Sequence, residues 1–179
     1  MEEKRIRVLN VEDEDVDQMA LVRFTKENGL PYDIDRAATL AEALKMRQAG
    51  NYDIVLLDYM MPDGTGLDLL ENIKGIPSIF ITGSGNEMVA VKAIKGGAHD
   101  YLIKDTAGMY LELLPVTIEN ALRTCELQKE KEMAEEALKV KLDEERRLNN
   151  ILLQREFRIK ELKEENEKLM RRVEELDKK

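Results

Sequence analysis

Cysteine, tryptophan and long apolar runs are what this sequence has least of. The 179 residues include no tryptophan and one cysteine, Cys125. A single cysteine excludes an intrachain disulfide. No apolar run approaches the roughly 20 residues that a membrane-spanning helix needs. The N-terminal segment MEEKRIRVLNVEDED has no apolar signal core. We therefore expect a cytoplasmic protein that does not enter a membrane.

Basic charge is scarce in the first two thirds of the chain. The net charge is −9, and residues 1–125 contribute −8 of it, with 21 acidic and 13 basic side chains. Residues 126–179 are nearly balanced, with 16 acidic and 15 basic side chains. Phosphate contacts require clustered Lys and Arg, whereas the pairs Arg146-Arg147 and Arg171-Arg172 are interleaved with acids. Direct binding to nucleic acid is therefore not expected.

Glycine and proline divide the chain into two parts. The last glycine is Gly108 and the last proline is Pro115. Before them, short β-rich runs alternate with helix-period segments that end at a glycine. The expected strands are Ile6–Val11, Tyr32–Arg36, Ile54–Leu57, Ser78–Thr82 and Tyr101–Ile103, and the expected helices are Val16–Asn28, Leu40–Ala49, Leu67–Lys74 and Glu87–Lys95. We expect a globular domain over 1–123 and a helical segment over 124–179.

The fold class follows from the apolar pattern of the strands. The runs VLNV, IVLL and IFIT are apolar without alternation, which is typical of strands buried on both faces of a parallel sheet. Strict alternation of strand and helix with right-handed crossovers gives an open, doubly wound α/β sheet of five parallel strands. Ligands of such folds bind beyond the carboxyl ends of the strands.

Polar residues lie at that edge at the ends of four of the expected strands. Glu12 and Asp13 follow the first strand, Asp58 the third and Lys104 the fifth, while Thr82 ends the fourth. Clustered carboxylates repel one another unless a cation lies among them, and ligands that are all oxygen favour Mg²⁺. An ionised aspartate can attack phosphorus to form an acyl phosphate. The remaining parts that phosphoryl transfer needs are a metal, an ammonium group and a hydroxyl.

Four segments in this order and spacing resemble a known family. VEDE, LLDYMMPDGTG, FITGSG and GAHDYLIKD resemble the signature segments of the receiver domains of two-component response regulators, and the resemblance covers roughly residues 4–123. It implies a flavodoxin-like fold with strand order 2-1-3-4-5. It also implies a response regulator in a phosphorelay, with a sensor histidine kinase or phosphotransfer protein as partner.

The resemblance also implies residue roles. Asp58 would be the phospho-acceptor, Thr82 would bind one phosphoryl oxygen, and Lys104 would pair with another. Tyr101 matches an aromatic position that turns inward as the threonine moves, although it could simply pack in the core. Gly83 would leave space for the phosphodonor.

Metal binding is implied in the same way. Glu12 and Asp13 would hold Mg²⁺ directly or through water, with Asp58 and the backbone carbonyl of Met60 completing the protein ligands. Met60 and Ser84 occupy variable positions that tune the phosphoryl lifetime in this family.

The sequence departs from the family pattern at two positions. The acidic pair is Glu-Asp where Asp-Asp is commoner, and Asp105 follows the lysine where the family usually has proline. Three other features have ordinary interpretations. Glu14, Asp15 and Asp17 would be solvated residues opening the first helix, His99 a surface residue, and Cys125 a helix-face residue.

The tail is expected to form one helix from Val116, with Pro115 in its first turn. A seven-residue repeat of apolar residues runs through it and is nearly regular from Ile159. Ile159, Asn166 and Val173 occupy the first position of the repeat, and Leu162, Leu169 and Leu176 the fourth. This pattern favours a parallel two-stranded coiled coil, hence a homodimer. The alternative is a solitary helix stabilised by ion pairs within it.

Three alternative functions remain open. The first is an aspartyl-phosphate hydrolase, although such enzymes commonly place a second acid two residues after the nucleophile, where this chain has Met60. The second is a degenerate receiver that serves as a dimeric scaffold. The third is that the chain is the N-terminal piece of a larger sensor protein.

Overall fold

The computed structural model describes residues 5–83 and 87–176, with the side chains of Glu87 and of residues 172–176 left aside. The Cα positions divide the chain into two units, Met1–Gln128 and Lys129–Lys179. The first unit contains a sheet with its helices, and the second is helical.

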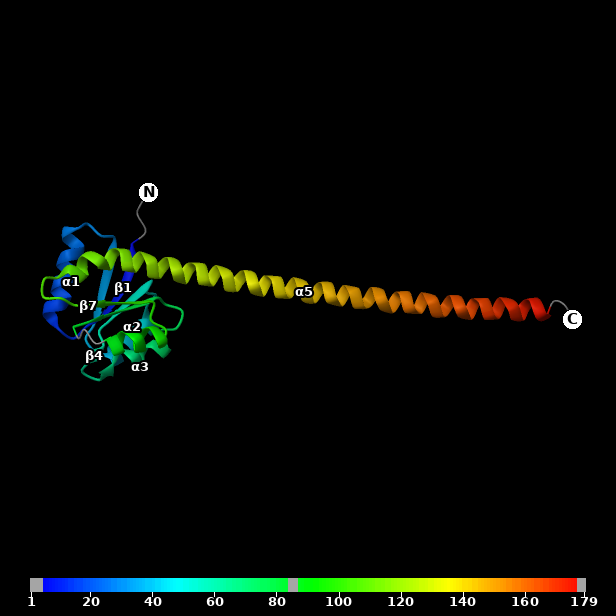
Figure 1. Ribbon diagram of the computed structural model, residues 1–179, viewed down its shortest axis with the longest axis horizontal. Coiled ribbons are helices and arrows are strands. Elements are labelled where there is room, and N and C mark those ends of the chain that lie inside the picture. Colours follow the sequence, from blue (N-terminus) through cyan, green and yellow to red (C-terminus); the bar gives the residue numbers. More distant parts are fainter. Residues whose placement is uncertain (1–4, 84–86, 177–179) are drawn as a thin grey trace. The chain divides into compact units, whose positions relative to one another are not determined.

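The first unit is built on a sheet of five parallel strands (Figure 1). The strands are β1 (Ile6–Val11), β2 (Tyr32–Ala37), β3 (Ile54–Leu57), β6 (Ser78–Thr82) and β7 (Asp100–Ile103). Their order is β2-β1-β3-β6-β7. This is the predicted order 2-1-3-4-5, because a short hairpin of β4 (Met60–Met61) and β5 (Gly64–Thr65) takes two labels. The doubly wound fold is confirmed.

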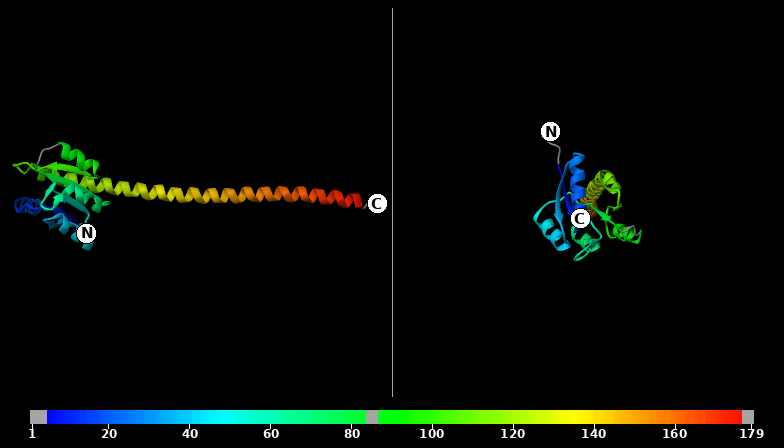
Figure 2. Two further views of the ribbon diagram at one scale, coloured as in Figure 1. Left: turned by 90° about the horizontal axis from the view of Figure 1, so that it is seen from below. Right: turned by 90° about the vertical axis from the view of Figure 1, so that its left-hand side faces the viewer.

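Helices pack on both faces of this sheet (Figure 2). They are α1 (Asp15–Glu27), α2 (Leu40–Ala49), α3 (Gly66–Leu70) continued by a 3₁₀ turn η1 (Glu71–Ile73), α4 (Glu87–Lys95) and α5 (Met109–Leu176). One core contains side chains of α2, α3 and α4, and the other contains side chains of α1 and of the first turns of α5. All residues of β3 and β6 are buried, which explains why their apolar runs do not alternate.

The start of α5 differs from the prediction. The helix begins at Met109, not at Val116, so Pro115 lies inside it. Tyr110, Leu111 and Leu114 are buried. Burial of each contributes about 1.5–3 kcal/mol, which together exceeds the roughly 3 kcal/mol that an interior proline costs.

Asp105, which stands after Lys104 where the family usually has proline, makes a contact that proline could not make. Its Oδ1 accepts a hydrogen bond from the backbone N–H of Met109 at 2.7 Å. Gly108 adopts a positive φ of 76° just before the helix. The aspartate therefore satisfies a backbone donor in the first turn of α5, a function that proline could not serve.

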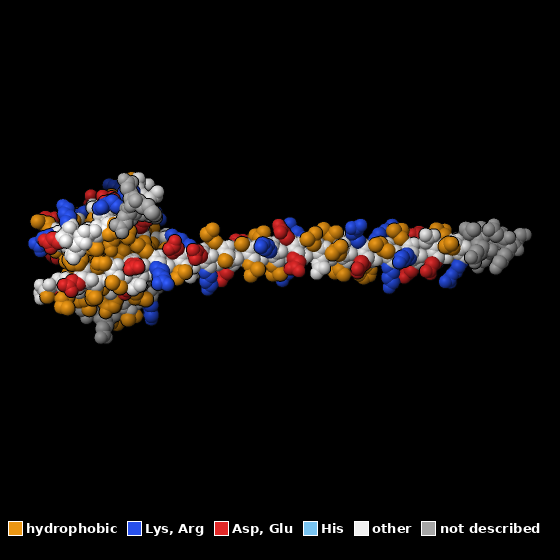
Figure 3. Space-filling view, turned by 90° about the horizontal axis from the view of Figure 1, so that it is seen from above, with side chains coloured by type: hydrophobic (Ala, Val, Ile, Leu, Met, Phe, Trp, Pro, Cys, Tyr) orange, Lys and Arg blue, Asp and Glu red, His pale blue; other side chains and the backbone are white. Residues whose placement is uncertain are grey.

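The described side chains of the second unit are all exposed, from Lys129 to Arg171. Figure 3 shows hydrophobic side chains interspersed with charged ones along this helix. Ion pairs one turn apart lie on its surface, including Lys131–Glu135 at 3.8 Å and Arg158–Glu161 at 3.1 Å. Among the described residues, no helix is long and apolar enough to cross a membrane.

Candidate functional site

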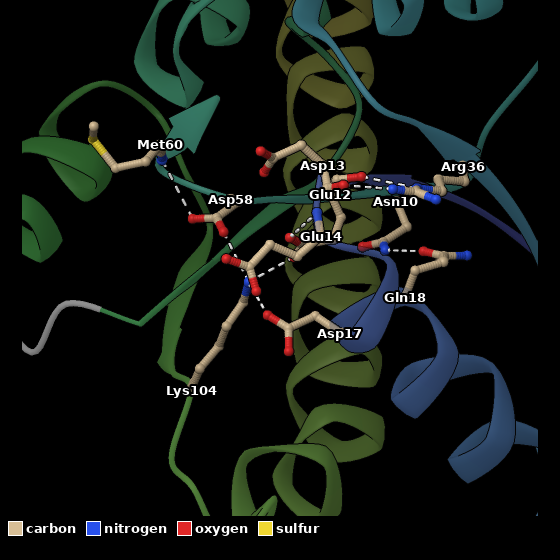
Figure 4. A network of polar contacts seen from close by, with 10 residues as sticks. All are labelled: Asn10, Glu12, Asp13, Glu14, Asp17, Gln18, Arg36, Asp58, Met60 and Lys104. Carbon is tan, nitrogen blue, oxygen red and sulfur yellow. Dashed lines mark hydrogen bonds and ion pairs between the residues drawn. The ribbon is translucent and has the colours of Figure 1, made fainter. Parts of the chain in front are cut away.

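The polar side chains that were predicted from the strand ends do come together. Backbone hydrogen bonds extend the sheet by one residue beyond three strands: Glu12 N–H to Ala37 O at 2.9 Å, Asp58 N–H to Val11 O at 3.0 Å, and Lys104 N–H to Thr82 O at 2.9 Å. Because parallel strands end at the same edge, this pairing holds Glu12, Asp58 and Lys104 in adjacent positions (Figure 4).

Lys104 lies at the centre of the site. Its Nζ is 2.6 Å from Glu12 Oε2, 2.6 Å from Asp17 Oδ2 and 2.8 Å from Asp58 Oδ2. Burial lowers the pKa of Lys104, but its hydrogen bonds to Asp17, Asp58 and Glu12 outweigh this and raise the pKa above the ordinary value. The side chain is therefore a fixed positive charge among carboxylates.

The prediction for Asp17 was wrong. It was expected to be solvated at the start of α1, yet its carboxylate pairs with Lys104, which follows β7. Asp15 is also paired, with the guanidinium of Arg36 on β2. No local pattern in the sequence shows these contacts, because they depend on how α1 is rotated against the sheet. Glu14 does expose its side chain as expected.

Three carboxylates form a group that could hold a metal ion. One oxygen each from Glu12, Asp13 and Asp58 lies within 4.8 Å of the others. These are hard oxygen donors on one edge of the sheet, as Mg²⁺ requires. Burial raises the pKa of Glu12, while Lys104 acts in the opposite direction. The residues present therefore fit a magnesium site.

Arg36 holds the loop that carries two of these carboxylates. Its Nε donates to the backbone oxygen of Glu12 at 3.0 Å, and its terminal nitrogen donates to that of Asp13 at 2.6 Å (Figure 4). No sequence motif singles out this arginine. Its position at the end of β2, beside β1, was the one available signal.

The other residues singled out in the sequence are Thr82, Met60, Tyr101, Gly83 and Ser84. Thr82 is buried at the end of β6, and the Met60 side chain is exposed while its N–H donates to Asp58 Oδ1 at 3.3 Å. Tyr101 is partly buried against the core that contains Phe80. Ser84 lies outside the described residues, and a Cβ built on Gly83 would meet no other described atom within 4 Å.

Two residues singled out in the sequence lie apart from the site. His99 is exposed before β7, and its Nδ1 accepts a hydrogen bond from the N–H of Ser78 at 3.3 Å. Cys125 is buried on α5, with its Sγ 3.8 Å from the backbone oxygen of Gly75. Both positions agree with the ordinary interpretations.

Comparison with known proteins gives a consistent family match. The model of the response regulator receiver domain matches residues 8–112. The methanogenesis regulatory protein FilR1 of Methanothrix harundinacea is 36% identical over 123 residues, which are 64% of this chain and 27% of that protein. The regulatory protein LuxO of Vibrio cholerae is 33% identical over 114 residues, 62% of this chain and 24% of that protein. The chain thus spans about a quarter of the length of these curated relatives.

A solved structure agrees with this match. The signal receiver domain of a putative LuxO repressor protein from Vibrio parahaemolyticus superposes with a TM-score of 0.61 and 28% sequence identity. The match covers 70% of this chain and 96% of that one.

Proposed function

The chain belongs to the response regulator receiver domain family, and from this premise we propose that Asp58 accepts a phosphoryl group from a histidine kinase or phosphotransfer protein. The observation that carries the proposal is the convergence of Asp58 with Lys104 and with the acidic pair Glu12 and Asp13. Receiver domains are signalling domains rather than classical enzymes, so the product of interest is the phosphorylated protein itself.

The chemistry requires one bond to form as another breaks. A carboxylate oxygen of Asp58 would form the new bond to phosphorus while the donor leaves with the electrons of its own bond to phosphorus. Lys104 would pair with one phosphoryl oxygen and the Thr82 hydroxyl would bind another. Glu12, Asp13, Asp58 and the Met60 carbonyl would hold Mg²⁺, which supplies charge neutralisation between carboxylates and phosphoryl oxygens.

The residue content of the site favours this function over the alternatives. A hydrolase of aspartyl phosphates would be expected to carry an acid two residues after Asp58, and the exposed Met60 supplies none. A degenerate scaffold would not need to keep Lys104 within 2.8 Å of Asp58. We therefore treat phosphoryl acceptance as the function of the first unit.

The direct test is labelling with a small phosphodonor. Acetyl phosphate with Mg²⁺ should add one phosphoryl group to the protein, and Asp58→Asn should abolish the addition because the amide is not a nucleophile at this site. Intact-mass spectrometry measures the outcome. Asp33→Asn is the control, since Asp33 forms an exposed ion pair with Arg5 at the other end of the strands. Stoichiometric labelling of Asp58→Asn would remove Asp58 from the proposal.

The proposal also includes an output. Phosphorylation would alter the surface of α4 and β7, with Thr82 and Tyr101 as the switch pair. Met88, Val91 and Ile94 already expose apolar side chains on α4.

We propose that residues 1–123 are the receiver and that residues 124–179 are a coiled-coil segment that forms a parallel homodimer. Ile159, Leu162 and Leu169 support this because each is exposed in the single chain and lies on the seven-residue repeat.

A further inference from the structure

All three N–H donors of the Lys104 ammonium group have a carboxylate partner. A lysine ammonium carries three N–H groups. The three acceptors at Lys104 lie at 2.6, 2.6 and 2.8 Å, so each donor has a partner (Figure 4). A phosphoryl oxygen can pair with Lys104 only if one of these carboxylates gives way.

The three carboxylates differ in what else they can bind. Glu12 and Asp58 belong to the group within 4.8 Å that also includes Asp13, and a bound metal would draw on those oxygens. Asp17 is not part of that group. Once a metal occupies Glu12 and Asp58, Asp17 is the remaining competitor for Lys104 among the three.

Exposure points to the same residue. The side chain of Asp17 is 27% exposed, against 6% for Glu12 and 13% for Asp58. A carboxylate near water is resolvated at little cost when it loses its partner, whereas a buried one is not. The Asp17–Lys104 contact is therefore the contact that can open.

We propose that Asp17, on α1, is a positioning residue for Lys104. Its carboxylate holds the Lys104 ammonium group and competes with the phosphoryl group for it, which limits the stability of the phosphorylated state. This inference rests on the proposed function of Asp58. It means that a side chain of α1, outside the acidic pair Glu12 and Asp13, affects how well Lys104 can bind the phosphoryl group. Removing the Asp17 carboxylate frees one donor of Lys104 and also removes a negative charge near the incoming anion.

The test compares beryllofluoride binding in matched variants of the full chain. With Mg²⁺ present, Asp17→Asn and Asp17→Ala should bind beryllofluoride roughly two- to fivefold more tightly than wild type, the range expected for a partly exposed ion pair. Asp17→Glu, which keeps the charge, should stay closer to wild type. Isothermal titration calorimetry gives the dissociation constants, and thermal melts check that each variant is folded.

Two controls separate this role from a general charge effect. Glu14→Gln removes the same charge from the residue just before α1, but the exposed Glu14 side chain has no contact with Lys104 among the described residues, and the change should alter the affinity less than Asp17→Asn. In a Lys104→Ala background the gain from Asp17→Asn should largely disappear, since coupled residues give non-additive effects.

Each outcome has one interpretation. If wild type binds no beryllofluoride and accepts no phosphoryl group, the proposed function fails, and this inference fails with it. If wild type binds it but Asp17→Asn binds equally or more weakly, the proposed function stands and the competing role of Asp17 is wrong. If the gain persists unchanged without Lys104, the effect is electrostatic and does not act through Lys104.

Discussion

Directly behind Asp58 the backbone of Gly66 passes so close that no side chain can fit. A Cβ built on Gly66 would lie under 3.0 Å from the backbone oxygen of Asp58 and from side-chain atoms of Phe80 and Leu57. Gly66 N–H also donates to the backbone oxygen of Tyr59 at 2.9 Å. The glycine therefore lets α3 begin against the very residue that is proposed to carry the phosphoryl group.

Gly66→Ala should destabilise the protein by about 1–3 kcal/mol, the usual cost of overpacking, because the backbone at Asp58 must move to make room. Urea unfolding of the variant and of wild type measures the difference. Gly50→Ala is the matched control, since a Cβ there meets other atoms only at ordinary contact distances of 3.4 Å and more. Equal midpoints for Gly66→Ala and wild type would show that the loop relaxes without cost.

Some site residues could be predicted from the order of the strands alone, and others could not. Asp58, Lys104 and Glu12 could be predicted because each directly follows an expected strand, and parallel strands end together. Asp17 and Arg36 could not be predicted in the same way. The contact of Asp17 depends on the rotation of α1, and that of Arg36 depends on the reach of a long side chain from β2 to the loop after β1.

Among the elements, strands were predicted more accurately than helix ends. β1, β3 and β6 have the expected bounds because mostly apolar runs without strict alternation mark them. α5 was misjudged since Pro115 is a strong local signal, whereas the burial of Tyr110 and Leu114 that overrides it is tertiary. The hairpin β4–β5 was missed because its strands have two residues each.

The start of α2 is held by two sets of hydrogen bonds. Thr39 Oγ1 accepts from Glu42 N–H at 3.1 Å, and the Glu42 carboxylate accepts from Ala38 N–H at 2.8 Å. Asp63, in the turn between β4 and β5, accepts from Leu40 N–H at 2.9 Å and Ala41 N–H at 3.0 Å. The hairpin thus supplies a second cap to a helix that precedes it in the chain.

This cap should make the stability of the protein depend on acidity. Hydrogen bonds from Leu40 and Ala41 lower the pKa of Asp63 below its ordinary value of 3.8. A lowered folded-state pKa means that the stabilisation is present above pH 3.8 and is lost as the pH falls through the folded-state value. Asp63→Ala should therefore melt below wild type at pH 6, and the gap should narrow below pH ~3.8.

Thermal melts of both proteins from pH 6 to pH 3 measure this gap. Asp53→Ala serves as a control for the loss of another carboxylate that accepts a backbone N–H, on a half-buried residue. A gap between wild type and Asp63→Ala that stays constant down to pH 3 would show that the charge of Asp63 does not contribute to the cap.

At the scale of the whole molecule, the open question is how the exposed repeat of α5 is covered. Between Ile159 and Leu169 the repeat leaves apolar side chains in water, which a second helix would bury. The side chains of Val173 and Leu176 lie outside the described residues. In a parallel pair in register, Arg158 would face Lys163 of the other copy, so the flanking charges do not select that orientation. The choice must come from the seam, where Asn166 is the polar residue.

We predict a parallel two-stranded dimer through Ile159–Leu176 that depends on Asn166. In this arrangement Asn166 can hydrogen-bond its own counterpart, whereas a shifted or antiparallel pair would leave it buried without that partner, at a cost of about 1–3 kcal/mol. Light scattering at micromolar concentration should give a dimer for the full chain. A version ending at Gln128, which keeps the buried Cys125 and the whole first unit, should be monomeric.

Orientation and register need a second measurement, because mass alone does not report them. A cysteine introduced at Leu162 of a Cys125→Ala chain, which keeps Asn166, should form a disulfide between copies under mild oxidation if the helices are parallel and in register, since like positions then lie opposite one another. Asn166→Leu should raise the melting temperature of the dimer while broadening its oligomeric states, because a buried apolar residue is more stable there but less selective. A monomeric full chain would contradict the dimer. A lower melting temperature for Asn166→Leu would mean that position 166 is not in the seam.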